Sequence, residues 1–99
     1  MAEWIYFIHA PREDFAATMT REEDRVWAEH FERLKRLLAQ GTLILAGPTL
    51  GQINTGLAII EVPDEATARR IMEAEPTIAG GLATGELRGF RIALIRGRD

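Results

Sequence analysis

Histidine is the residue type whose position first suggests chemistry in this sequence. His30 lies in a run whose apolar residues recur at helical spacing, and about 100° per residue places it inside their stripe, beside Val26, Leu34 and Leu37. An imidazole there faces the body of the protein. Because histidine changes its protonation state near neutral pH, it suits a general acid or base in a pocket between this helix and a sheet. The position equally suits a core histidine that bonds one backbone carbonyl, and the spacing leaves both interpretations open.

A catalytic histidine needs a group that orients it, and Glu75 is the best-placed carboxylate. It stands just before Pro76, where a second helix is expected to end. If the two helices lie side by side, that end approaches the first turns of the helix that carries His30. The alternative for Glu75 is a solvated carboxylate at a helix end.

His9 is the other histidine, at the end of an apolar strand. It is predicted to bind substrate by adding a second nitrogen at the rim of the His30 pocket, or else to be a strand-end polar residue. The two histidines and scattered carboxylates include no H-x-x-x-H or similar pair, so we predict no metal site. The absence of cysteine excludes disulfides and thiol catalysis.

Length and charge restrict the classes of protein further. Ninety-nine residues predict a single domain over 1–99. The net charge of −3 comes from 12 basic and 15 acidic residues with no long run of either, which argues against a nucleic-acid surface. No segment approaches the roughly 20 apolar residues of a membrane span. The N-terminus lacks a signal-peptide pattern, so a cytoplasmic location is expected.

The elements that must position these side chains follow the order β-α-β-β-α-β. Thr20 and Glu23 form a capping box before the first helix, and Asp64 is an N-cap for the second. A loop at 10–19 is expected to tuck onto the body through Phe15 and Met19. Strands are predicted at 4–9, 43–48, 57–62 and 86–96, and helices at 20–40 and 65–74. Right-handed crossovers place both helices on one face of a four-stranded antiparallel sheet, a ferredoxin-like α+β fold.

The predicted strands are apolar on both faces. In the first strand Trp4, Tyr6 and Ile8 alternate with Ile5 and Phe7. Two helices cover one face only, and monomers rarely expose a large apolar patch. The sequence therefore predicts a homodimer through the open sheet face, with a mildly apolar monomer as the alternative.

An ordered set of residues along nearly the whole chain resembles the YciI-like (YCII-related) proteins. The set consists of Phe15-Ala16-Ala17-Thr18-Met19-Thr20 with Glu22-Glu23, His30 with Leu34 and Leu37, Gly41, Leu45-Ala46-Gly47-Pro48, Gly56, Ala66, Ala68, Pro76, Gly81-Leu82 and Glu86-Leu87. The resemblance implies a ferredoxin-like fold that dimerises as an α/β barrel. It also implies lyase- or dehydrochlorinase-type chemistry on small aromatic-derived rings, with no metal or organic cofactor.

The resemblance further implies a catalytic His–Asp pair. His30 matches the histidine, and the aspartate falls on Glu75, because Glu75-Pro76 stands where the family has Asp-Pro. Glutamate is one methylene longer, so it orients the imidazole only if its backbone lies slightly farther away.

Two hypotheses about function follow. The first is a cofactor-free enzyme of lyase or isomerase type, in which His30 and Glu75 do acid–base chemistry on a small cyclic or enolisable molecule. The second is a non-catalytic dimer that uses the same cleft to bind a small ligand or a protein.

Overall fold

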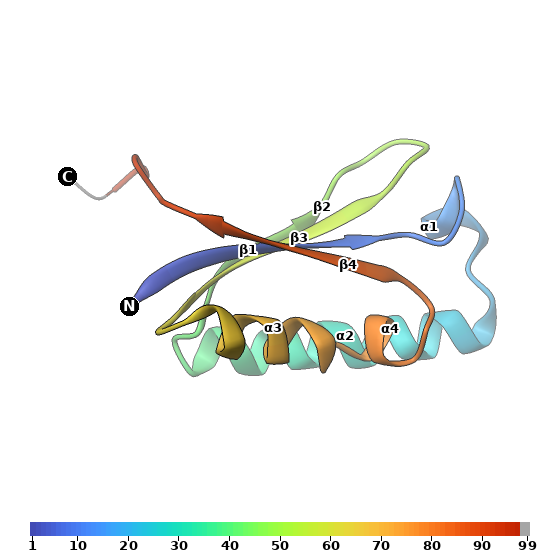
Figure 1. The fold of residues 1–99 in the computed structure, drawn as a ribbon. Coiled ribbons are helices and arrows are strands. Elements are labelled where there is room, and N and C mark those ends of the chain that lie inside the picture. The colour runs from blue at the N-terminus through green and yellow to red at the C-terminus, as the bar shows by residue number, and fades with distance from the viewer. Residues whose placement is uncertain (98–99) are drawn as a thin grey trace.

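The structure has two layers, a sheet and a layer of helices against one of its faces (Figure 1). The computed structural model describes residues 1–97. Its elements in chain order are β1 (Ala2–His9), α1 (Phe15–Thr18), α2 (Arg21–Ala39), β2 (Leu43–Pro48), β3 (Thr55–Val62), α3 (Glu65–Glu73), α4 (Pro76–Ala79) and β4 (Thr84–Phe90). The strands pair antiparallel in the order β2-β3-β1-β4. The predicted ferredoxin-like pattern is therefore confirmed.

The two long helices begin where the sequence predicts. The Thr20 hydroxyl accepts from the Glu23 backbone N–H at 3.1 Å, and a Glu23 carboxylate oxygen accepts from the Thr20 N–H at 2.9 Å. Asp64 accepts from the Thr67 N–H at 2.8 Å. Each contact satisfies an N–H group that the first helical turn leaves without a partner.

The strands β1, β3 and β4 each begin two residues earlier than predicted, at Ala2, Thr55 and Thr84. Three further differences are larger. The last strand ends at Phe90, not at residue 96, because β4 pairs with β1 and the pairing stops at Glu3 opposite Phe90. The predicted loop at 10–19 contains the short helix α1, whose Phe15 is buried. Pro76 does not only follow α3 but begins α4, since proline is favoured at the first helical position.

The core lies between the sheet and the helices. Tyr6 and Ile8 of β1 and Ile60 of β3 are almost fully buried and belong to one apolar cluster with residues of α2 and α3. Gly85 allows α3 and α4 to pack closely against β4, because a Cβ at this position would lie 2.7 Å from the Ile78 side chain of α4. This close approach fixes the segment between α3 and α4, which carries Glu75.

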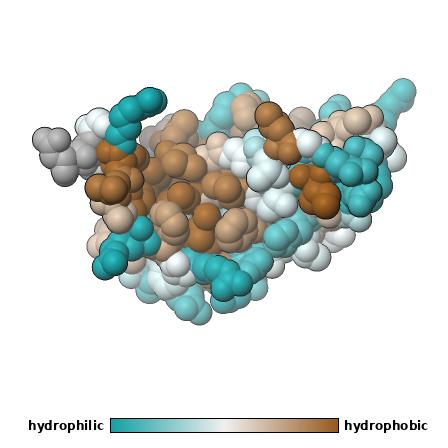
Figure 2. All heavy atoms as spheres, turned by 90° about the horizontal axis from the view of Figure 1, so that it is seen from above, coloured by the Kyte–Doolittle hydropathy of each residue, from teal (hydrophilic) through white to brown (hydrophobic). Residues whose placement is uncertain are grey.

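Within the described residues, no helix covers the other face of the sheet (Figure 1). Figure 2 views this face and shows a broad hydrophobic area across the strands. Strand alternation and pairing assign it to Ile5, Phe7, Leu45, Leu57, Ile59 and Phe90. Leu45 and Phe90 are more than two-fifths exposed.

No helix in residues 1–97 has the length and apolar character needed to cross a membrane.

Candidate functional site

His30 lies on the buried side of α2, as the helical spacing predicts. Its side chain is 11% exposed, and its ring lies 5.1 Å from the Trp27 ring, measured between centroids. Nδ1 forms a hydrogen bond with Oε1 of Glu75. The structure thus brings together the two residues that the sequence predicts as a pair, 45 positions apart in the chain.

Glu75 is held by the junction between α3 and α4. Its N–H donates to the Met72 carbonyl at 3.1 Å, and its carbonyl accepts from Ile78 and Ala79 at 2.9 and 2.7 Å. These contacts leave little freedom to the backbone on either side of the carboxylate, and the side chain is fully buried. A rigid backbone with an enclosed side chain is what a residue needs to orient an imidazole.

The contact with Glu75 determines which ring nitrogen of His30 is free to interact with a ligand. An ionised Glu75 can only accept, so Nδ1 carries a proton in this contact, and Nε2 is the nitrogen that has a lone pair when the ring is neutral. In residues 1–97 no protein group bonds Nε2, and it is not among the fully enclosed atoms. Nε2 is therefore the nitrogen that a ligand can reach.

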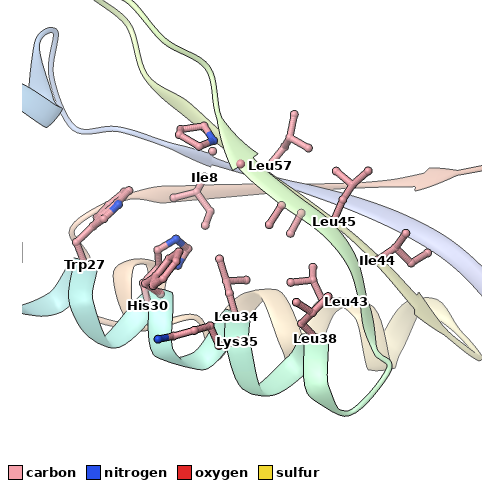
Figure 3. A pocket seen from close by; sticks show the side chains of 16 residues that line it. Ile8, Trp27, His30, Leu34, Lys35, Leu38, Leu43, Ile44, Leu45 and Leu57 are labelled. Atoms are coloured by element: carbon pink, nitrogen blue, oxygen red, sulfur yellow. The ribbon is translucent and has the colours of Figure 1, made fainter. Parts of the chain in front are cut away.

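A cavity of about 520 Å³ lies beside His30, between α2 and the strands β2 and β3. Figure 3 shows Trp27, His30 and Leu34 projecting from α2 toward Ile8 on the sheet. The lining is Ile8, Trp27, His30, Phe31, Leu34, Lys35, Leu38, Leu43, Ile44, Leu45, Ala46, Gly47, Pro48, Gly56, Leu57 and Ala58. Among residues 1–97, His30 and Lys35 are its only ionisable lining residues, and no carboxylate lines it. The size and the apolar walls suit a small organic ligand.

Arg33 and Tyr6 lie near Glu75, and neither was predicted to belong to the site. Arg33 Nη1 is 3.7 Å from Glu75 Oε2, and Arg33 Nη2 donates to the Ile71 carbonyl at 2.9 Å. Tyr6 is fully buried. Burial raises the pKa of the Tyr6 phenol to about 12, with Glu75 adding to the rise and Arg33 opposing it. Helical spacing could have indicated Arg33, because Arg33 follows His30 by three residues and so lies on the same face of the helix.

His9 is not brought to this cavity. Successive residues of a strand point to opposite faces, so Ile8 faces the helices and His9 faces the open side. Its ring stacks near Phe7, and its Nε2 lies 3.1 Å from Glu86 Oε1. The expectation that His9 lies at the rim of the His30 pocket is therefore wrong.

The part of the chain that the structure describes contains no group of three or more His, Cys, Asp or Glu residues placed to hold a metal ion. His30 has a single carboxylate partner and His9 has another, on opposite faces of the sheet.

Comparison with known proteins identifies the family to which this two-layer βαββαβ domain belongs. The family model of the YCII-related domain matches residues 4–91. The chain belongs to this family, and the resemblance seen in the sequence is confirmed.

One solved structure with this fold is an enzyme. It is 5-chloro-2-hydroxyhydroquinone dehydrochlorinase from Burkholderia phenoliruptrix AC1100, in complex with 2,5-dihydroxybenzoquinone. The likeness has a TM-score of 0.67 at 20% identity, over 92% of this chain and 94% of that one. At this identity the likeness establishes the fold alone. No curated protein matches the chain.

Proposed function

We propose that this protein is an acid–base enzyme in which His30, oriented by Glu75, moves a proton of a small cyclic or enolisable molecule. The observation that supports the proposal is the contact between the buried imidazole and the fully buried carboxylate, at the wall of a ligand-sized cavity. Histidine is the side chain most often used for such proton transfer. The name of the similar dehydrochlorinase supports a small ring as the class of substrate.

The proposed step begins at Nε2. This nitrogen takes a proton from a C–H bond of the ligand, and the electron pair of that bond stays on the ligand as an enolate. The resulting imidazolium is stabilised by Glu75 through Nδ1. An isomerase then returns the proton to another ligand atom. A lyase instead uses the electron pair to form a double bond and expel an anionic leaving group, and the proton on Nε2 then passes to that group or to water.

The experiment combines a binding screen with a proton-exchange measurement. Small cyclic and enolisable molecules are screened for a rise in unfolding temperature, because a ligand that binds only the folded state stabilises it. Each ligand found is then incubated with the protein in D₂O, and loss of its exchangeable C–H signal is followed by proton NMR. Exchange that His30→Gln abolishes supports the enzyme. Ligands that bind without exchange support the non-catalytic binding domain instead.

We also propose that the protein works as a homodimer through the open face of the sheet. The apolar residues across this face, with Leu45 and Phe90 exposed, support the proposal (Figure 2). We expect a mass in solution of about twice the 11.1 kDa of the chain by light scattering. Phe7→Asp, in the open face, is expected to give the monomer mass, whereas Ala66→Asp on the exposed side of α3 is not. A wild-type mass of one chain at micromolar concentration would rule out the dimer.

A further inference from the structure

We propose that Arg33 is a positioning residue of this site: its guanidinium balances the charge of Glu75 and so keeps Nε2 of His30 free to accept a proton. The inference rests on the proposed function, because it assigns how the histidine is kept ready for it. Arg33 itself is not among the residues that line the cavity.

The contacts of Arg33 fix it beside Glu75. One nitrogen, Nη2, donates to the Ile71 carbonyl in α3 at 2.9 Å, and this bond joins α2 to α3. The other, Nη1, faces Glu75 Oε2 at 3.7 Å. Both Nη1 and Oε2 are enclosed and have no hydrogen-bond partner elsewhere in residues 1–97. The two atoms therefore have only each other as a charged partner, and a shift of a few tenths of an ångström would join them.

The contact between Arg33 and Glu75 affects the protonation of His30 through charge balance. A buried carboxylate is costly unless an opposite charge compensates it. Arg33 is always protonated, so it supplies that charge without using a proton of the site. If Arg33 were uncharged, Glu75 would draw the compensating proton onto His30. An imidazole that is already protonated at Nε2 cannot take a proton from a ligand.

Tyr6 of β1 is a third neighbour of Glu75, after His30 and Arg33, and it is neutral. Its hydroxyl is enclosed and has no partner among the described residues. With its pKa raised to about 12, the phenol keeps its proton near neutral pH, so Tyr6 adds no negative charge near Glu75. The charged or titratable groups around His30 are thus Glu75 from the α3–α4 junction, Arg33 and Lys35 from α2, and Tyr6 from β1.

The test is an NMR titration of the His30 ring in variants of the whole chain. Arg33→Met removes the charge at similar size, and Arg33→Gln also keeps a donor for the Ile71 carbonyl. Arg36→Met is the matched control, because Arg36 is an exposed residue one turn further along α2. We expect both Arg33 variants to move the titration midpoint of His30 to higher pH, by more than Arg36→Met does, and Arg33→Lys to restore it.

A measurement on the unmodified protein guards against variants that do not fold. Near neutral pH the ¹⁵N shifts of His30 are expected to report a neutral ring with its proton on Nδ1. A doubly protonated ring there would overturn the inference.

The outcomes separate this inference from the proposed function. If the titration responds to Glu75→Gln but not to Arg33→Met or Arg33→Gln, the pair stands and the role of Arg33 is wrong. If Arg33 controls the titration but bound ligands show no proton exchange, the positioning is correct and the proposed enzyme is not.

Discussion

The molecule contains two histidine–glutamate pairs on opposite faces of one sheet. His30 and Glu75 lie beneath the helices with side chains 11% and 0% exposed, whereas those of His9 and Glu86 on the open face are 43% and 39% exposed. The residue types are the same, and each pair makes a side-chain contact. What differs is the surroundings, and these decide what each pair can do.

Water and salt screen the exposed pair but not the buried one. The His9 ring and then Arg88 lower the pKa of the Glu86 carboxyl, and solvent reaches all three groups. In the buried pair the carboxylate cannot be solvated, so its charge acts on the few groups that enclose it. The buried setting lets the carboxylate orient its histidine strongly, and a cavity adjoins His30 there.

The largest expected difference between the pairs is in catalysis. With an exchangeable ligand in D₂O, we expect His30→Gln to slow the exchange by about 10²–10⁴-fold, the usual contribution of a general acid or base. His9→Gln should change it by less than about threefold, since His9 lies across the sheet from the cavity. The rates are measured by proton NMR at equal protein concentration. Equal losses in both variants would contradict the assignment of the site to one face.

The next difference is in stability. Glu75→Ala leaves Arg33 and the His30 ring without the carboxylate between them, and we expect it to lower the free energy of unfolding by about 3–5 kcal/mol. Glu86→Ala removes a solvated carboxylate and should move the urea midpoint little. Urea unfolding at neutral pH, followed by circular dichroism, measures both. Glu75→Gln is the matched variant, because it keeps the size and loses only the charge. A Glu75→Ala midpoint as close to wild type as that of Glu86→Ala would refute the distinction.

Much of the buried site followed from the sequence because its causes are local. The capping box at Thr20 fixes where α2 begins, and helical spacing then points His30 inward. Glu75 was found because Pro76 marks the end of α3 and because the family places its acid there. That Glu75 reaches the imidazole also depends on α4 lying against α2, and α4 was not predicted. The right-handed crossovers predict only that the two long helices share one face of the sheet.

The errors arose where the outcome depends on distant parts of the chain. Helical spacing places Arg33 on the face of α2 that carries His30, but its role depends on contacts with Ile71 and Glu75, about 40 positions away, which that spacing does not predict. The end of β4 depends on where β1 begins. His9 was different, since the alternation that places Tyr6 and Ile8 with the helices already assigns His9 to the open face.

The smallest expected difference is in the acid dependence of stability. Because the pKa of Glu86 is lowered in the folded protein, the folded state binds fewer protons there than the unfolded state does. Its contribution is therefore present above the ordinary glutamate pKa of 4.5 and is lost as the pH falls through the lowered value. We expect Glu86→Gln, which cannot titrate, to reduce the fall in unfolding temperature between about pH 5 and about pH 3 relative to wild type.

Repeating this last measurement in added salt provides a further test of the comparison. The difference between Glu86→Gln and wild type should shrink in about 0.5 M salt, because the charges of His9, Glu86 and Arg88 are exposed and screened. The effect of Glu75→Ala on the urea midpoint at neutral pH should survive the same salt, because its partners are enclosed. If salt reduced both effects alike, burial would not be what distinguishes the two pairs, and the placement of the chemistry at His30 would lose its physical basis.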